Sequence, residues 1–247
     1  MWSLLERERI ARFPGARGRI PNFAGAERAA ALLAEQPEWA RAKVVKANPD
    51  APQLPVRALA LEQKKRLYMA VPRLRSSRPF VRLDRTRLRG SARAAATISG
   101  AARAGTPVAI EAMDHIDLIV CGTVAVDRDG VRVGKGGGYS DLEFALLREA
   151  GLVDARTVIA TTVHDRQLVD GSLPETAHDF RVDLIVTPTR GVRPKRAKRP
   201  HGVIWSDLDD AKVAEIPALS ARAAAAARPR RRGGAARPSR RRASPSS

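Results

Sequence analysis

Three apolar segments rich in β-branched residues stand out along the chain and predict buried strands. They cover residues 118–126, 157–163 and 184–187. Unbroken apolar runs of this length are typical of strands that are buried on both faces of a parallel sheet. Shorter strands are expected at 42–46, 66–71 and 80–83.

Between these strands, apolar residues recur at helical spacing. We expect helices at 3–12, 24–34, 54–64 and 141–150, and a short helix within 90–95. Phe13-Pro14 ends the first of these segments, and Gly151 follows the 141–150 segment as a C-cap. Strands that alternate with helices predict an α/β fold, in which helices cover both faces of a mainly parallel sheet.

Composition supports a packed domain followed by a basic extension. The chain has 247 residues, and 44% of them are hydrophobic, which is enough for a core. Residues 191–247 hold 15 Lys and Arg against four Asp and Glu, a net charge of +11, which leaves +8 of the total +19 for the first 190 residues. We therefore expect a domain over 1–205 and a basic tail over 206–247.

The tail is rich in Ala, Arg, Pro and Ser, and we expect disorder from about residue 221. Two interpretations of it are open. Its arginines could contact nucleic acid nonspecifically through counterion release, or the tail could be a solvated extension. The second interpretation is favoured because the tail has no aromatic residues on which bases could stack.

Cysteine usage and hydropathy indicate the compartment. Cys121 is the only cysteine, so a disulfide framework and a thiolate zinc site are excluded. No run approaches the ~20 apolar residues of a membrane span, and the first ten residues do not read as a signal peptide. We expect a cytoplasmic protein without membrane contact.

The segment with the clearest chemistry is the glycine-rich stretch 132–141. It reads Arg-Val-Gly-Lys-Gly-Gly-Gly-Tyr-Ser-Asp. Glycines allow positive φ and a close approach of backbone N–H groups to an anion, Lys135 adds positive charge, and the predicted helix after the loop directs its N-terminus toward the same point. Spacing excludes a P-loop and a dinucleotide fingerprint. Composition alone leaves two alternatives, a phosphate-binding loop and a flexible hairpin turn.

The residues around the loop resemble the 5-formyltetrahydrofolate cyclo-ligase family. Its hallmark, FD-x-x-G-x-R-(L/I)-G-x-G-x-G-Y-Y-D, is spelled here as Val126-Asp127, Gly130, Arg132-Val133-Gly134, Gly136, Gly138-Tyr139 and Asp141. A second segment of the family is matched by Leu173-Pro174-Glu175, His178-Asp179 and Val182-Asp183 through Thr187-Pro188.

Further segments resemble one branch of this family, the methenyltetrahydrofolate synthetase domain-containing proteins. They are Gly18-Arg-Ile-Pro-Asn-Phe, Val45-Lys-Ala-Asn-Pro-Asp50, Val71-Pro-Arg-Leu74, Thr162-Val-His-Asp165 and Lys198-Arg-Pro-His-Gly-Val-Ile-Trp205. The resemblance covers roughly residues 1–205. Members of the branch in animals can carry an RNA-recognition motif, and no aromatic segment of that kind follows Trp205.

The resemblance implies a three-layer Rossmann-like fold with the ligand at the carboxyl ends of the strands. It also implies ATP-dependent closure of 5-formyltetrahydrofolate to 5,10-methenyltetrahydrofolate, with release of ADP and phosphate. In that chemistry the formyl oxygen is phosphorylated, nitrogen N10 attacks the activated carbon, and phosphate leaves. Catalysis of this kind depends mostly on positioning and charge neutralisation.

Site residues follow from the matching hallmark. Phosphates and substrate are assigned to the loop, with Lys135 and Tyr139 as the catalytic candidates, and the predicted magnesium ligands are Asp141 and Asp179. The complete set predicted to bind nucleotide comprises Arg132, Gly134, Lys135, Gly136, Gly137, Gly138, Tyr139 and Ser140. The His164-Asp165 and His178-Asp179 pairs are otherwise typical of turns and surfaces.

Two departures from the family keep other functions open. Ser140 stands where the family has a second tyrosine, and no K-x-x-x-R motif precedes Glu6. Either those cations are lost or the natural start lies upstream. The main alternative is a non-catalytic nucleotide-binding relative associated with RNA, and a further one is ATP-dependent chemistry on another small molecule.

Overall fold

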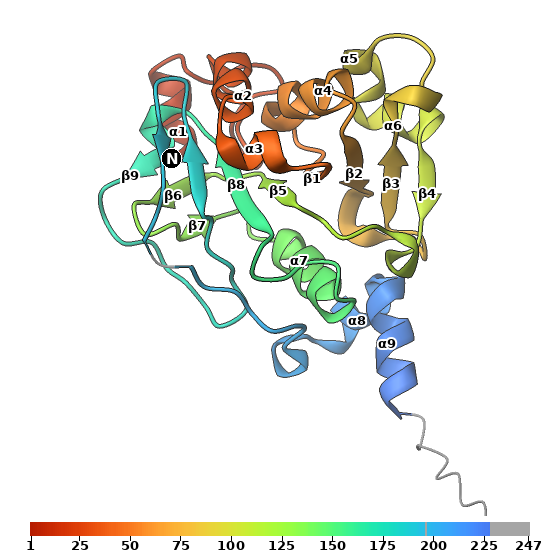
Figure 1. Cartoon of the computed structure of the whole chain (residues 1–247). Helices are drawn as coiled ribbons and strands as arrows, with labels where there is room; N and C mark the ends of the chain where they lie inside the picture. Colours follow the sequence, from red (N-terminus) through yellow and green to blue (C-terminus); the bar gives the residue numbers. More distant parts are fainter. Residues whose placement is uncertain (196, 228–247) are drawn as a thin grey trace, which may run out of the picture.

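The computed structural model describes residues 1–195 and 197–227 (Figure 1). The predicted disorder of 228–247 lies outside the described residues. The centre of the fold is an eight-stranded sheet in the order β11-β10-β8-β5-β1-β2-β3-β4. Its strands are β1 (Val44–Ala47), β2 (Arg66–Ala70), β3 (Phe80–Leu83), β4 (Thr106–Val108), β5 (Leu118–Cys121), β8 (Val158–Thr162), β10 (Leu184–Val186) and β11 (Gly191–Val192).

The sheet is mixed, with a parallel centre and antiparallel edges. Strands β10, β8, β5, β1 and β2 run parallel, with Val45 of β1 opposite Leu118 on one side and Leu67 on the other. Strands β3, β4 and β11 join antiparallel at the two edges. The predicted α/β class with a parallel or mixed sheet is confirmed.

Helices cover both faces of this sheet (Figure 1). The cluster of buried residues on one face comes mainly from α2, α4, α5 and the central strands, and the cluster on the other face from α7, α9 and the same strands. The helices are α1 (Trp2–Arg7), α2 (Ala26–Ala34), α3 (Pro37–Arg41), α4 (Leu54–Glu62), α5 (Ala92–Ala95), α6 (Ile98–Ala104), α7 (Tyr139–Glu149), α8 (Asp210–Glu215) and α9 (Pro217–Ala227).

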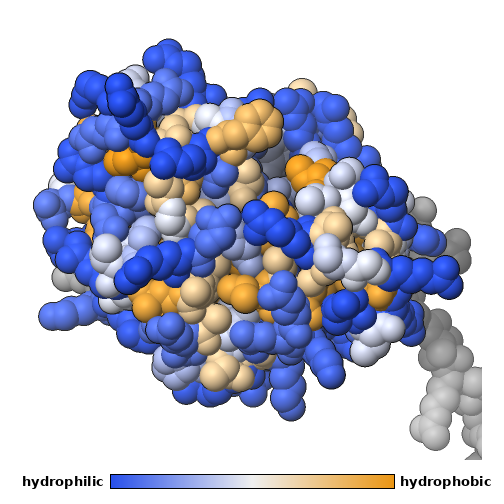
Figure 2. All heavy atoms as spheres, turned by 90° about the horizontal axis from the view of Figure 1, so that it is seen from above, coloured by the Kyte–Doolittle hydropathy of each residue, from blue (hydrophilic) through white to orange (hydrophobic). Residues whose placement is uncertain are grey.

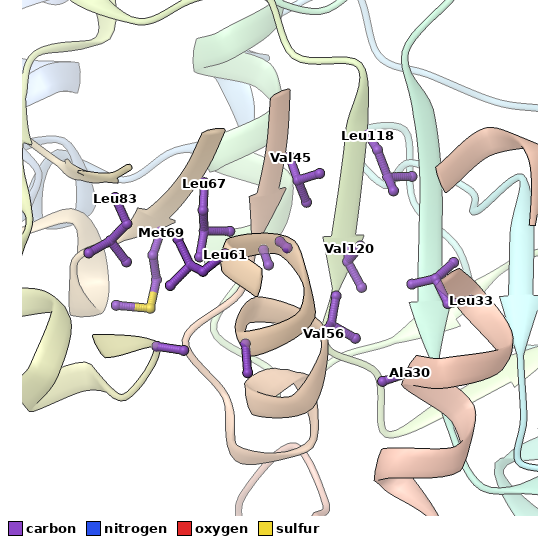
Figure 3. Packing of buried hydrophobic residues seen from close by; sticks show 14 of the residues in the cluster. Ala30, Leu33, Val45, Val56, Leu61, Leu67, Met69, Leu83, Leu118 and Val120 are labelled. Atoms are coloured by element: carbon purple, nitrogen blue, oxygen red, sulfur yellow. The ribbon is translucent and has the colours of Figure 1, made fainter. Parts of the chain in front are cut away.

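Strand alternation assigns the side chains to these two cores. On β1 and β2, Val45, Leu67 and Met69 point toward α4, where they meet Val56 and Leu61 (Figure 3). Intervening residues of the strands point to the opposite face and pack against α7. Because both faces are apolar, β5 and β10 read as unbroken hydrophobic runs in the sequence, whereas β1 carries the buried Lys46. Seen from above, the outer surface is mostly hydrophilic, with small hydrophobic groups between the polar side chains (Figure 2).

The predicted strand at 118–126 is two strands. Strand β5 ends at Cys121. The next strand, β6 (Ala125–Asp127), belongs to a second sheet with β7 (Arg132–Val133) and β9 (Leu168–Val169). At the break, a Cβ on Gly122 would lie 2.9 Å from Asp50 Oδ2 and 3.0 Å from Ile20. Glycine is therefore required there because neighbouring chain segments approach the backbone closely.

The predicted boundary of the basic tail is wrong. Residues 206–227 are part of the folded body: Ile216 and Leu219 are fully buried and pack in the α7 core, and α9 continues to residue 227. Disorder from about 221 was predicted because arginine and alanine dominate the composition. Apolar residues spaced by three, Val213, Ile216 and Leu219, provide the buried face that the composition obscures.

Other element boundaries differ slightly from expectation. The first helix ends at Arg7, and a second short helix, α6, follows α5, with the Thr97 side chain accepting a hydrogen bond from the backbone of Gly100 as its N-cap. Within the described residues, no helix combines the length and apolarity needed to cross a membrane.

Candidate functional site

A cleft of about 1490 Å³ opens where the parallel strands end. Its walls include the segments that directly follow β1, β2 and β5, namely 48–51, 71–73 and Gly122, together with the glycine-rich loop 134–138. This is the edge of an open α/β sheet at which ligands bind. A volume above the roughly 300–1,000 Å³ of a usual small-molecule pocket leaves room for two ligands.

The glycine-rich loop connects β7 to α7 and depends on glycine for its path. Gly136 has φ of +92° and Gly138 has φ of +65°, values that side-chain-bearing residues rarely adopt. A Cβ on Gly137 would lie 2.9 Å from the Tyr139 ring. The loop therefore combines unusual backbone angles with close packing against its own aromatic neighbour.

The backbone donors of this loop are available to a ligand. No N–H group of residues 134–138 donates a hydrogen bond to another group in the described part of the chain. The N-terminus of the 11-residue helix α7 follows directly after Gly138. Free N–H groups and the positive end of a helix dipole form an environment suited to phosphate.

The two basic side chains predicted to bind phosphate, Lys135 and Arg132, have different surroundings. Lys135 is half-exposed, and its Nζ lies 3.7 Å from Asp50 Oδ1 across the cleft. Arg132 is buried, donates to Asp141 Oδ1 at 2.6 Å and lies 4.2 Å above the Phe180 ring. Its Nε is buried without a hydrogen-bond partner in the described chain. The structure thus leaves Lys135 exposed to the cleft and places most of the Arg132 guanidinium against Asp141.

The predicted magnesium ligands, Asp141 and Asp179, line the same cleft. One oxygen of Asp179 accepts hydrogen bonds from the Thr176 N–H and Oγ1, both at 2.7 Å. In the described residues no cluster of three or more metal-ligating side chains exists. Two carboxylates fit Mg²⁺ that arrives with phosphates, because this ion keeps several water and phosphate ligands.

All residues predicted for nucleotide and metal therefore lie together in one cleft. This group comprises Arg132, Gly134, Lys135, Gly136, Gly137, Gly138, Tyr139, Ser140, Asp141 and Asp179.

A buried polar network behind the loop was missed by sequence reasoning. Lys46, 2% exposed at the end of β1, forms an ion pair with Glu143 of α7 and donates to Asn48 Oδ1 at 2.7 Å. The Asn48 amide in turn donates to Ser140 Oγ at 2.9 Å. The sequence features that could have indicated this network are a lysine within a predicted strand and a glutamate within a predicted helix. The network fixes Ser140 on the wall of the cleft.

A buried arginine supports the opposite wall. Arg57 of α4 donates to the carbonyl oxygens of Asn48, Asp50 and Ala96, which hold the segment after β1 in place. Burial lowers the pKa of Arg57 to about 10, and the nearby charge of Asp50 opposes that shift. Arg57 remains protonated at neutral pH and serves as a positioning cation.

The two His-Asp pairs differ in location. His164 Nδ1 accepts from the Arg166 N–H and closes a turn, while Asp165 accepts from two threonine hydroxyls. His178 lines the cleft, and its Nδ1 lies 3.1 Å from Asp207 Oδ2. The first pair has the turn role that the sequence indicated, and only the second pair faces the candidate site.

The C-terminal segment also contributes to the cleft. Lys212 and Glu215 of α8 lie in its wall beside the glycine-rich loop. Sequence reasoning placed both residues in the tail, because nothing in the local pattern links residue 212 to residue 137.

Comparison with known proteins places this geometry in a family. Residues 2–188 match the 5-formyltetrahydrofolate cyclo-ligase family. The methenyltetrahydrofolate synthase domain-containing protein of Mus musculus is 39% identical over 226 residues, 89% of this chain and 60% of that protein. The protein of the same name from Bos taurus is 39% identical over 230 residues, 89% of this chain and 59% of that protein.

The chain thus spans about 60% of the length of these curated relatives. Among solved structures, the NMR structure of Aquifex aeolicus 5,10-methenyltetrahydrofolate synthetase is similar with a TM-score of 0.47 and 20% identity, covering 70% of this chain and 83% of that chain. The extent of the family match, together with the glycine-rich loop at the sheet edge, leads to one conclusion: this chain belongs to the 5-formyltetrahydrofolate cyclo-ligase family.

Proposed function

We propose that this chain binds Mg-ATP and uses it to close 5-formyltetrahydrofolate into 5,10-methenyltetrahydrofolate. The observation that carries the proposal is the glycine-rich loop, whose N–H groups have no hydrogen-bond partner among residues 1–195 and 197–227 and whose Lys135 faces the cleft. Membership of the cyclo-ligase family supports the folate substrate. The cleft volume of about 1490 Å³ supports simultaneous binding of nucleotide and folate.

Each group of residues has a defined task in this reaction. The loop N–H groups and Lys135 bind the phosphates of ATP and neutralise charge that develops on the transferred phosphoryl group. Asp141 and Asp179 would hold Mg²⁺, which supplies further charge neutralisation at the phosphates. Tyr139 closes the side of the loop and is the candidate for contact with the substrate.

The chemical steps balance as phosphoryl transfer followed by ring closure. The formyl oxygen takes the γ-phosphoryl group, and ADP leaves. The N10 lone pair then forms a bond to the formyl carbon, and phosphate departs with the former formyl oxygen while N10 loses its proton. The protein has to hold both ligands in contact and exclude water, because proximity supplies much of the rate enhancement.

One observation favours a second candidate, ATP-dependent chemistry on a more polar small molecule. Ser140, which replaces an aromatic residue of the family hallmark, is held by Asn48 at 2.9 Å and makes this part of the cleft wall polar. A polar wall favours a hydrogen-bonding substrate group over the face of a pterin ring.

The experiment is a coupled assay with purified protein, Mg²⁺, ATP and 5-formyltetrahydrofolate. The expected result is growth of the near-ultraviolet absorbance of the methenyl product in step with ADP. Asp179→Asn should suppress turnover because it removes a metal ligand while its neighbours remain. Lys43→Ala is the control, since this exposed lysine precedes β1 at the opposite edge of the sheet.

The outcomes separate the candidate functions. ATP binding without turnover on 5-formyltetrahydrofolate would refute the cyclo-ligase proposal and leave a nucleotide-binding protein or an enzyme for another substrate. Absence of ATP binding by calorimetry would refute the role of the loop itself. Asp141→Asn tests the second metal ligand, with folding checked by circular dichroism because Asp141 also neutralises the buried Arg132.

A further inference from the structure

Helix α8, in the C-terminal segment of the chain, contacts the glycine-rich loop. Lys212 Nζ donates to the Gly137 carbonyl oxygen at 3.3 Å and lies 3.7 Å from the centroid of the Tyr139 ring. The Tyr139 hydroxyl donates to the Glu215 carboxylate at 3.1 Å and 3.2 Å. Two residues of α8 therefore contact Gly137 of the loop and Tyr139, the first residue of α7.

These contacts matter because the loop has few attachments of its own. No loop N–H group donates to the described chain, and its carbonyl groups accept from Lys212 at Gly137 and from the α7 backbone at Gly138. Glycines at these positions also carry a large conformational entropy in the absence of restraint. A loop of this kind needs an outside anchor if its N–H groups are to converge on one phosphate.

The anchor is itself fixed to the body of the protein. Glu215 accepts from Arg75 at 3.0 Å and 3.2 Å, and this hydrogen bond lowers the pKa of the Glu215 carboxyl group. Directly after α8, Ile216 and Leu219 are fully buried in the core beneath α7. The position of Lys212 is thus supported by the tertiary contacts of Glu215, Ile216 and Leu219, which follow it in the chain.

This segment lies beyond the part of the chain that matches the family, which ends at residue 188. We infer that Lys212 is a positioning residue for the phosphate-binding loop, acting through Gly137 and Tyr139, so that nucleotide affinity depends on the segment 210–219. The inference rests on the proposed function for its ligand. The ordering of the loop by Lys212 can be measured without any ligand.

The first test measures the loop without nucleotide. In the full chain, Lys212→Ala should lower the backbone NMR order parameters of residues 134–138, whose N–H groups make no hydrogen bond within the described chain, and leave those of β5 and β8 unchanged. Lys212→Arg should restore the order parameters of the loop, since a guanidinium can donate to the same carbonyl and stack on the same ring. Lys43→Ala, which removes an exposed charge far from the cleft, should have no effect.

The second test measures Mg-ATP affinity of the same variants by calorimetry. Lys212→Ala should weaken binding by about 10-fold, the size expected for loss of one charge-assisted hydrogen bond, and Lys212→Arg should stay within about 3-fold of the parent. Unchanged order parameters of residues 134–138 in Lys212→Ala would overturn the inference. So would order parameters that fall throughout the protein, because they would indicate a general stabilising role.

Failure of the proposed function is distinguishable from failure of this inference. A parent protein that does not bind ATP would refute the proposed function, and the NMR order parameters of the loop would still decide whether Lys212 orders it. If the parent binds ATP and Lys212→Ala binds it as tightly as the parent does, the anchor has no role in affinity and the inference is wrong.

Discussion

The ion pair between Lys46 and Glu143 allows a demanding test of how the cleft is supported. The two side chains are 2% and 7% exposed, and neither contacts solvent to any useful extent. Lys46→Met keeps the volume but leaves the Glu143 carboxylate buried without its cation. Removal of one partner of a buried pair destabilises proteins by about 3–5 kcal/mol, so we expect a loss of that size.

The double variant Lys46→Met with Glu143→Leu should behave differently. It removes both charges, so the remaining cost is the Asn48 amide oxygen that loses its donor, about 1–3 kcal/mol. The double variant is therefore expected to be more stable than Lys46→Met alone. Such a coupling energy is what a double-mutant cycle measures.

The assay is urea unfolding at neutral pH, followed by circular dichroism and analysed for free energy and slope. Arg93→Met serves as the control, because Arg93 pairs with Glu27 at 3.4 Å on the surface with both side chains more than half-exposed. Exposed pairs contribute about 0–1 kcal/mol, so this variant should stay close to the parent. Two results would refute the reasoning. One is a loss of unfolding free energy in Lys46→Met no larger than in the control, and the other is a double variant no more stable than Lys46→Met.

Three further predictions follow from individual contacts. Lys135→Ala should weaken ATP binding by about 1.5–3 kcal/mol in calorimetry, and Gly136→Val should weaken it further because φ is +92° there. Leu219→Ala should lower the free energy of unfolding by about 2–5 kcal/mol, since this side chain is fully buried. Hydrogen bonds from Arg181 lower the pKa of the Glu175 carboxyl group in the folded protein below its ordinary value of 4.5. The ionised Glu175 therefore stabilises the folded state above pH 4.5, and this contribution is lost as the pH falls through the folded-state pKa. Glu175→Gln should make the melting temperature less dependent on pH in that acidic range.

Each of these has a result that would contradict it. ATP affinity unchanged in Lys135→Ala would remove the assigned role of the loop cation. An effect of Leu219→Ala no larger than that of Ala224→Ser, at an exposed position of α9, would mean that the C-terminal helix is not part of the core. An acid transition of the same slope in Glu175→Gln and in the parent would contradict the linkage.

The fold class was determined by local sequence patterns. Apolar runs such as 184–187 and helical periodicity such as 54–64 are set by residues close in sequence, so they report which segments are buried. The glycine-rich loop was also evident, because positive φ at Gly136 and Gly138 requires glycine wherever the segment folds. Its position beside a helix start followed from residues 132–150 alone.

Tertiary structure decided the parts that join distant segments. Lys46 and Glu143 are 97 positions apart, and Lys212 and Gly137 are 75 apart, so no local pattern relates them. The C-terminal segment shows the same limit: its composition suggests a solvated tail, and only the apolar surface of α7 and the sheet gives Leu219 a place to be buried. Composition measures what a segment can bury alone, whereas the fold supplies the complementary surface.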